Sequence, residues 1–182
     1  MKTKELTNIA VCIALLCVSA YLSFPLPFTP AMVTAQTIII NVIALLLTPK
    51  QAFMTVLLYI IIGILGLPIF SGGASGLARI LSPSGGFLLA FLVAAPVMSL
   101  IKLKIGNSFK NYLLVTTLAG MPIIYLIGAL WMSQIGQMGL MAALNAAVLP
   151  FVIGDTLKCV IASVLVLRLE HVPSRKLMAT YE

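Results

Sequence analysis

Two residues of opposite charge lie three positions apart inside a long apolar segment of this sequence. Asp155 and Lys158 belong to VLPFVIGDTLKCVIASVLVL, residues 148–167. On a helix, side chains three apart share a face, so the carboxylate and the ammonium group can neutralise each other. Each charge costs about 2.5–3.5 kcal/mol in the middle of a membrane, whereas an exposed pair of this spacing contributes only ~0.2–0.5 kcal/mol. An ion pair that merely fixes helix packing is the alternative, but this imbalance favours a binding or transport site.

Other polar side chains are expected at a similar depth in the membrane. If the segment enters the membrane at Val148, a rise of 1.5 Å per residue puts Asp155 ~10 Å and Lys158 ~15 Å below the surface. Gln36 would lie ~8 Å below the same surface in its own apolar segment. The other polar candidates for this layer are Tyr59, Tyr125, Asn145 and Arg79. We therefore predict that polar groups gather in this half of the membrane and that the other half is almost purely hydrocarbon.

These side chains could hold a small molecule with polar ends. Lys158 or Arg79 could neutralise a carboxylate, because both carry positively charged N–H donors. Asp155 and Asn145 could accept hydrogen bonds from N–H groups of the ligand. Each position also has an ordinary alternative. A tyrosine or glutamine inside a membrane can simply bond a neighbouring helix, and Arg79 can stay solvated or bind a lipid headgroup.

Residue patterns for catalysis or metal binding are absent from the sequence. Cys12, Cys17 and Cys159 lack metal-site or disulfide spacing and are typical of small buried side chains. The one histidine, His171, has no neighbour in the sequence for zinc or triad chemistry. An intramembrane enzyme would need a nucleophile with a base, or a metal cluster. We therefore predict no enzyme activity, no catalytic residue, no metal and no cofactor.

The scaffold that holds these residues is indicated by the composition. The 182 residues are 62% apolar and 8% charged, with a mean hydropathy of +1.18. Soluble domains average about 45–50% apolar and 25% charged residues, so this chain cannot bury its apolar surface in a core of its own. We predict an all-α integral membrane protein with a single domain, residues 1–182. No segment alternates as a barrel strand does, which leaves helices as the spanning structure.

Six apolar segments are candidates for spanning helices. A helix needs roughly 20 residues to cross an apolar core of ~30 Å. The predicted helices cover residues 6–24, 31–48, 52–69, 87–103, 111–132 and 148–169.

Basic residues mark one side of the membrane. Nine of the eleven Lys and Arg residues lie before the first segment, after the last, or near the second and fourth connections. They are Lys2, Lys4, Lys50, Lys102, Lys104, Lys110, Arg168, Arg175 and Lys176. The other connections contain only Arg79, so the positive-inside rule predicts that both termini are cytoplasmic. The net charge of +7 then reflects topology, and it predicts no nucleic-acid partner.

The outer connections differ from the short, basic inner ones. They read PLPFTP at 25–30, SGGASGLARILSPSGG at 71–86 and SQIGQMGLMAALNAAVLP at 133–150. Long loops with almost no charge could fold over the bundle and cover a site. The glycines of 71–86 resemble a phosphate loop, but no GK[ST] follows and no strand precedes them, so we exclude that site.

The whole chain resembles a known family of membrane proteins. Its glycine-rich connection SGGASGLARILSPSGGF and its GDTLK segment are similar to the BioY family, the biotin-specific S components of energy-coupling factor (ECF) transporters. The resemblance implies an S-component fold and a subunit of the cell membrane that captures biotin from outside. It also implies a transmembrane T component as partner and two cytosolic ABC-type ATPases. Ala10 and Ala14, a small-xxx-small pair that lets a helix approach closely, would form the docking face for the T component.

The resemblance also suggests roles for the polar residues. Biotin has a fused ureido ring and a carboxylate tail. Asp155 and Asn145 are suitable acceptors for the ureido N–H groups, while Lys158 and Arg79 are suitable donors to the ureido carbonyl or the carboxylate. Which end of biotin meets which residues stays open. A second hypothesis is a self-contained transporter, alone or as an oligomer, that uses the same site without ATPases.

Overall fold

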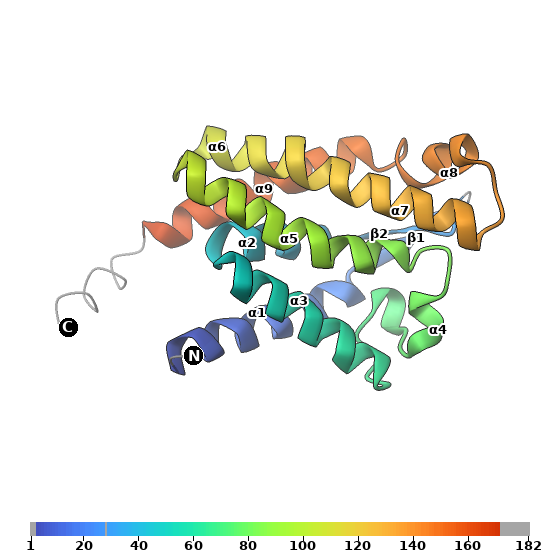
Figure 1. Cartoon of the computed structure of the whole chain (residues 1–182), viewed down its shortest axis with the longest axis horizontal. Coiled ribbons are helices and arrows are strands. Elements are labelled where there is room, and N and C mark those ends of the chain that lie inside the picture. Colours follow the sequence, from blue (N-terminus) through green and yellow to red (C-terminus); the bar gives the residue numbers. More distant parts are fainter. Residues whose placement is uncertain (1–2, 28, 172–182) are drawn as a thin grey trace.

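The computed structural model describes residues 3–27 and 29–171 and is mostly helical (Figure 1). Its first half contains α1 (Thr3–Tyr21), β1 (Ser23–Pro25), β2 (Met32–Thr34), α2 (Gln36–Leu46), α3 (Pro49–Ile64), a 3-10 turn (Ser71–Gly73) and α4 (Leu77–Ile80). Its second half contains α5 (Gly86–Ile105), α6 (Phe109–Leu114), a π-helical turn (Val115–Gly120), α7 (Met121–Ile135), α8 (Leu140–Ala147) and α9 (Val152–Glu170).

Local capping signals explain where two of the helices begin. The Thr48 hydroxyl accepts from the Gln51 N–H, while the Gln51 side chain accepts from the Thr48 N–H. This capping box, with Pro49 in the first turn, starts α3 three residues before the predicted position. The Ser108 side chain caps α6 in the same manner by accepting from the Asn111 N–H at 3.2 Å.

Two predicted helices in the first half of the chain are shorter in the structure. Residues 32–34 form β2, which pairs antiparallel with β1, so α2 starts at Gln36 rather than residue 31. A short apolar run does not distinguish a strand from a helix, which explains the error. α3 stops at Ile64 because Gly66 adopts a φ of 108°, in the left-handed region, before the chain reaches Pro68.

The count of six spanning helices is therefore not confirmed by the described residues. α1, α5 and the continuous helix over 109–135 are long and apolar enough to cross a membrane. α8 and α9 together form a fourth candidate, bent by 51° at the break between them. α2 and α3 are apolar but have only 11 and 16 residues. The chain is thus mostly helical, with several apolar helices and a small two-stranded sheet that the all-α prediction did not include.

α5 is the central helix of the bundle, packed against α2, α3 and α7 (Figure 1). Its buried face carries small residues, including Ala90 and Ala94, which let these neighbours approach closely. α1 packs on α3 and α2, and α9 packs on α2 and α6. Ser99 of α5 also donates a 2.6 Å hydrogen bond to the carbonyl of Leu47, just after α2 ends.

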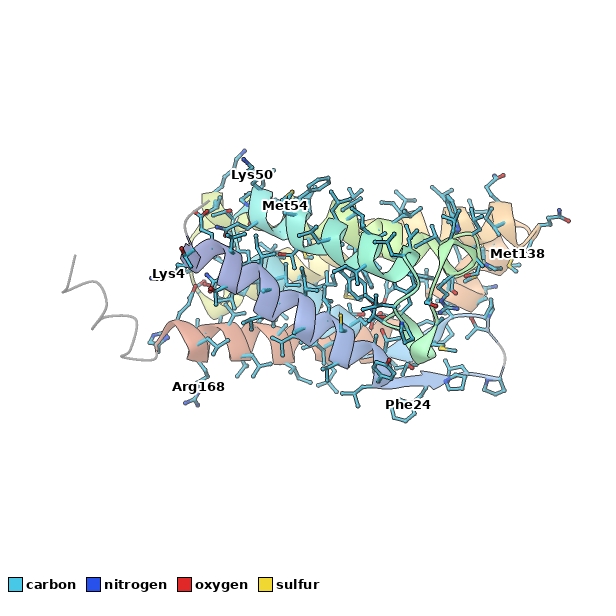
Figure 2. All side chains as sticks on the ribbon, turned by 90° about the horizontal axis from the view of Figure 1, so that it is seen from below. Lys4, Phe24, Lys50, Met54, Met138 and Arg168 are labelled. Atoms are coloured by element: carbon cyan, nitrogen blue, oxygen red, sulfur yellow. The ribbon has the colours of Figure 1, made fainter. Side chains whose placement is uncertain are left out.

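The two ends of the bundle differ in charge and in chain structure. Lys4, Lys50 and Arg168 lie at one end, called here the basic end (Figure 2). The start of α1, the end of α5, the start of α6 and the end of α9 all lie there (Figure 1). The opposite end, called here the loop end, holds β1, β2, α4 and α8. Arg79 lies in α4, so the charge asymmetry of the sequence is present in the fold.

The prediction of an almost purely hydrocarbon half near the basic end is wrong. Tyr112, which is fully buried, donates a 2.6 Å hydrogen bond to Glu170. Lys102 forms a 3.8 Å ion pair with the same carboxylate. Between this cluster and the loop end, Asn41 is 1% exposed and donates to the Cys159 thiol at 3.4 Å. Polar groups therefore occur along the whole length of the bundle. The hydropathy of each segment taken alone does not reveal these contacts between segments.

Candidate functional site

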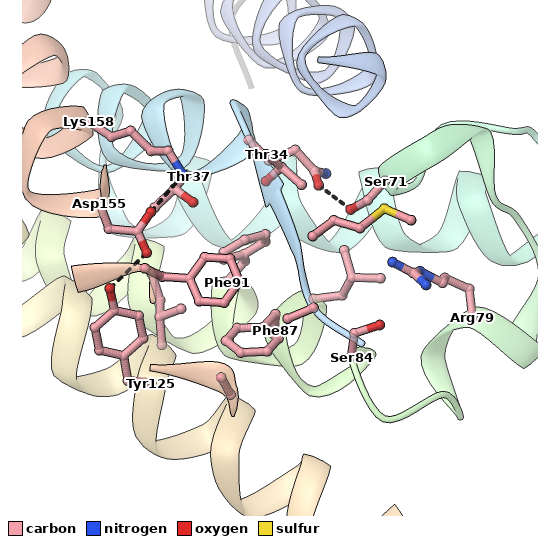
Figure 3. A pocket seen from close by; sticks show the side chains of 17 residues that line it. Thr34, Thr37, Ser71, Arg79, Ser84, Phe87, Phe91, Tyr125, Asp155 and Lys158 are labelled. Atoms are coloured by element: carbon pink, nitrogen blue, oxygen red, sulfur yellow. Dashed lines mark hydrogen bonds and ion pairs between the residues drawn. The ribbon is translucent and has the colours of Figure 1, made fainter. Parts of the chain in front are cut away.

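A partly open cavity lies toward the loop end, between the helices and the glycine-rich connection (Figure 3). Its empty volume is about 600 Å³, including the space at its open mouth. The cavity is lined by Ala31, Met32, Thr34, Gln36, Thr37, Ser71, Arg79, Ser84, Phe87, Leu88, Phe91, Ile124, Tyr125, Ala147, Phe151, Asp155 and Lys158.

Asp155 and Lys158 form an ion pair at one end of this cavity (Figure 3). Lys158 Nζ donates to Asp155 Oδ1 at 2.7 Å, and the Tyr125 hydroxyl donates to Asp155 Oδ2 at 2.8 Å. The side chains of Asp155 and Lys158 are only 9% and 13% exposed. Both carboxylate oxygens therefore have a donor, and the charge of the lysine is neutralised within the site.

The start of α9 lies close to the Asp155 carboxylate. α9 begins at Val152 instead of the predicted residue 148, so Asp155 lies in its first turn. The N-terminal end of a helix carries a partial positive charge that favours an acidic side chain nearby. Because the chain breaks between α8 and α9, the Asp155 carboxylate lies near the positive end of α9. In a straight helix that began at residue 148, Asp155 would lie farther from that end.

Arg79 lies across the cavity from the Asp155–Lys158 pair (Figure 3). Within residues 3–27 and 29–171, no carboxylate forms an ion pair with its guanidinium group and no acceptor forms a hydrogen bond with it. Partial burial lowers the pKa of Arg79 from its ordinary value, but an arginine still stays charged at neutral pH. The cavity therefore has a neutralised pair at one end and a cation available for an anionic group at the other.

Aromatic side chains form the wall between these two polar ends. Phe87 and Phe91, both on α5, line the cavity between Asp155 and Arg79 (Figure 3). Phe151 lines it from the turn before α9. Such walls bury the apolar part of a ligand, while a few polar groups fix its orientation.

Gln36 lines the cavity from the first turn of α2, with its amide held on both sides. Its Nε2 donates to the Tyr59 hydroxyl at 2.6 Å, and its Oε1 accepts from the Ser71 hydroxyl at 2.8 Å. Tyr59 does not line the cavity and lies behind Gln36 in the core. Gln36 and Tyr59 therefore form a hydrogen bond between neighbouring helices, which is the alternative to ligand binding that the sequence analysis left open for them.

The structure brings together five of the seven residues predicted to bind ligand. Asp155, Lys158, Tyr125, Gln36 and Arg79 line one cavity. The other two lie apart from its lining: Tyr59 is fully buried behind Gln36, and Asn145 is exposed on α8. Their roles in ligand binding, like those of the five, stay predictions. Ala10 and Ala14 lie on an exposed face of α1, outside the cavity lining.

Several polar residues of the cavity were missed by the sequence analysis. Thr37 follows Gln36 in α2, and Ser71 and Ser84 lie within the glycine-rich connection. A serine or threonine carries no strong signal of its own in an apolar chain. The position of these residues beside Gln36 and within the outer loop that carries Arg79 was the available clue.

The arrangement suits a small molecule with N–H donors at one end, an apolar body and an anionic group. Asp155 offers acceptor lone pairs, the aromatic wall offers apolar surface, and Arg79 offers a free positive charge. Among residues 3–27 and 29–171, no group of three or more His, Cys, Asp or Glu side chains could hold a metal ion.

Comparisons with known proteins agree with this architecture. The model of the BioY family matches residues 1–175. A probable biotin transporter BioY of Pyrococcus horikoshii is 36% identical over 170 residues, which cover 93% of this chain and 98% of that protein. A biotin transporter BioY of Thermotoga maritima is 31% identical, with 92% of this chain and 96% of that protein covered. A crystal structure of the S-component for biotin from an ECF-type ABC transporter matches with a TM-score of 0.86 and 30% identity, covering 93% of this chain and 94% of that one.

Proposed function

Because this chain belongs to the BioY family, we propose that it is a biotin-binding S component of an ECF-type transporter. The observation that carries the proposal is the cavity itself. It combines a buried Asp155–Lys158 pair, an aromatic wall and the free cation of Arg79 in one cavity. The family relationship supports a transport subunit rather than an enzyme, because the matching relatives are biotin transporters.

The charges of the cavity favour one orientation of biotin. The ureido ring lies at the Asp155 end, where the carboxylate accepts from a ureido N–H. The carboxylate tail of biotin points to Arg79, because the charge of Lys158 is already neutralised by Asp155 at 2.7 Å. A planar guanidinium group suits a carboxylate, which it can bind through two parallel hydrogen bonds. Phe87 and Phe91 contact the apolar ring and chain between the two ends.

The charge asymmetry supports an orientation in the membrane. Lys4, Lys50 and Arg168 mark the basic end, which faces the cytoplasm by the positive-inside rule together with both termini. The cavity then opens toward the outside of the cell. In this orientation, the protein captures biotin from outside the cell and delivers it toward the cytoplasm.

Energy for the inward step comes from partners. The exposed face at Ala10 and Ala14 on α1 is the docking surface for a T component, because small residues let another helix approach closely. Two cytosolic ATPases act through that component. Uptake of biotin into vesicles that contain this chain alone would instead support the self-contained transporter.

A binding titration tests the proposed function. The single tryptophan, Trp131, donates a hydrogen bond to the Ser82 carbonyl beside the cavity, so its fluorescence can report occupancy. Biotin added to the purified protein in mild detergent is expected to change this fluorescence to saturation with one site per chain, and calorimetry gives the same stoichiometry. Calorimetry that detects no binding of biotin would contradict the proposal.

A further inference from the structure

Three side chains connect the glycine-rich connection to the helices beneath it. The Tyr59 hydroxyl of α3 donates a 2.7 Å hydrogen bond to the Ile69 carbonyl. The same hydroxyl accepts from Gln36 Nε2 of α2 at 2.6 Å, and Gln36 Oε1 accepts from the Ser71 hydroxyl at 2.8 Å. Gln36, Tyr59 and Ser71, called here the relay, therefore attach the start of the connection and the residues just before it to α2 and α3, at residues 69 and 71.

The relay is buried where hydrogen bonds are hard to replace. Gln36 is 1% exposed and Tyr59 is 0% exposed. A hydrogen bond is stronger in such surroundings than in water, and removal of one partner leaves a buried polar group unsatisfied. Tyr59 lies outside the cavity lining. Its hydroxyl can thus influence a ligand only through the groups that it holds.

Packing contacts support the same part of the connection. The Phe70 ring meets the Tyr59 ring edge-on, with centroids 5.6 Å apart. Phe70 also lies against Gly63, where any Cβ atom would collide with the ring. The Gly76 N–H donates to the Gly63 carbonyl at 2.8 Å. Residues 69–76 are therefore fixed to α3 by both packing and hydrogen bonds.

The fixed segment leads directly to the free cation of the cavity. Ser71 lines the cavity, and α4, which carries Arg79, starts at Leu77, one residue after the segment ends. A shift of residues 69–76 would move Arg79 relative to the Asp155–Lys158 pair. Among the described residues, Arg79 and Lys158 are the basic groups of the cavity lining. The position of Arg79 thus depends on the relay.

We propose that Gln36, Tyr59 and Ser71 are positioning residues that hold segment 69–76 and Arg79 closed against the cavity, and that the relay thereby sets how slowly the ligand leaves. This inference rests on the proposed function for the identity of the ligand, biotin. It changes the predicted role of Tyr59 from a ligand contact to a residue that acts through Gln36 and the Ile69 carbonyl.

Tyr59→Phe is the direct test, because it removes the hydroxyl and keeps the ring contact with Phe70. Each lost hydrogen bond is expected to speed biotin dissociation roughly threefold to tenfold. Association should change less, since variants of one interface differ mostly in dissociation rate. Ser71→Ala removes only the outer bond of the relay and should act in the same direction with a smaller factor, which keeps the test available if Tyr59→Phe folds poorly.

Tyr112→Phe is the matched control. Tyr112 is also 0% exposed, and its hydroxyl also makes a 2.6 Å hydrogen bond, to Glu170 near the basic end. Both variants lose one buried hydroxyl and should lose comparable thermal stability. Only Tyr59→Phe should speed biotin release, so equal dissociation rates in the two variants would overturn the proposal.

Hydrogen exchange on the ligand-free protein separates this proposal from the proposed function. Backbone amides of residues 69–79 should exchange faster in Tyr59→Phe than in wild type and should be unchanged in Tyr112→Phe. Unchanged exchange of these amides in Tyr59→Phe would overturn the relay whatever the ligand is. Failure of the wild-type protein to bind biotin would overturn the proposed function, and the exchange result would still decide whether the relay holds the segment.

Discussion

Replacement of Asp155 by asparagine tests the binding chemistry of the cavity at its buried carboxylate. The variant keeps the size of the side chain but removes the negative charge that Lys158 and Tyr125 contact at 2.7 and 2.8 Å. A hydrogen bond to a charged group contributes about 1.5–3 kcal/mol. Loss of the one accepted from biotin should therefore weaken binding roughly 10- to 100-fold, at about 1.4 kcal/mol for each factor of ten. Calorimetry of purified wild type and variant measures this ratio directly.

Stability must be measured in the same experiment, because the variant also leaves the Lys158 ammonium without its counter-ion. Breaking a buried ion pair typically costs about 3–5 kcal/mol, whereas removing both charges costs much less. Asp155→Asn combined with Lys158→Met should therefore be more stable than Asp155→Asn alone, while its affinity for biotin stays low. A folded Asp155→Asn protein with wild-type affinity for biotin would refute the assignment of this carboxylate to the ureido group.

Other predictions address the remaining parts of the account. Arg79→Gln should weaken binding of biotin roughly tenfold or more and barely affect biotin methyl ester, because only biotin has the carboxylate; equal losses for both ligands in calorimetry would disprove the orientation. Ala10→Trp or Ala14→Trp should prevent co-purification of a T component and leave biotin affinity unchanged; assembly that survives both changes would exclude this docking face. Glu170→Gln should lower the free energy of unfolding by about 1–3 kcal/mol in detergent without changing biotin affinity, and a loss of affinity would show that the cluster near the basic end communicates with the cavity.

The sequence predicted the positions of the apolar helices better than their ends. Hydropathy located α1, α5 and the helix over 109–135 within a few residues. It missed β2 and α8, because segments this short carry too little periodic signal in their hydropathy. It also missed the capping box at Thr48, which the letters TPKQ contain.

The candidate site was predictable where charge alone identified a residue. Asp155, Lys158 and Arg79 are conspicuous in an apolar chain, and all three line one cavity. Asn145 and Tyr59 looked equally suitable, yet one is exposed on α8 and the other lies behind Gln36. The direction in which a side chain points depends on the rotation and bending of its helix, which packing against neighbours determines.

The most direct measurement of the central claim is the amount of biotin bound to the protein after mild detergent extraction from cells grown with biotin. Mass spectrometry of the purified wild-type protein should find biotin in a ratio approaching one molecule per chain. The same preparation of Asp155→Asn and Arg79→Gln should contain far less, because each variant loses one polar end of the cavity. Wild-type protein that is folded and contains no biotin, or variants that retain as much as wild type, would contradict the claim that this cavity binds the vitamin.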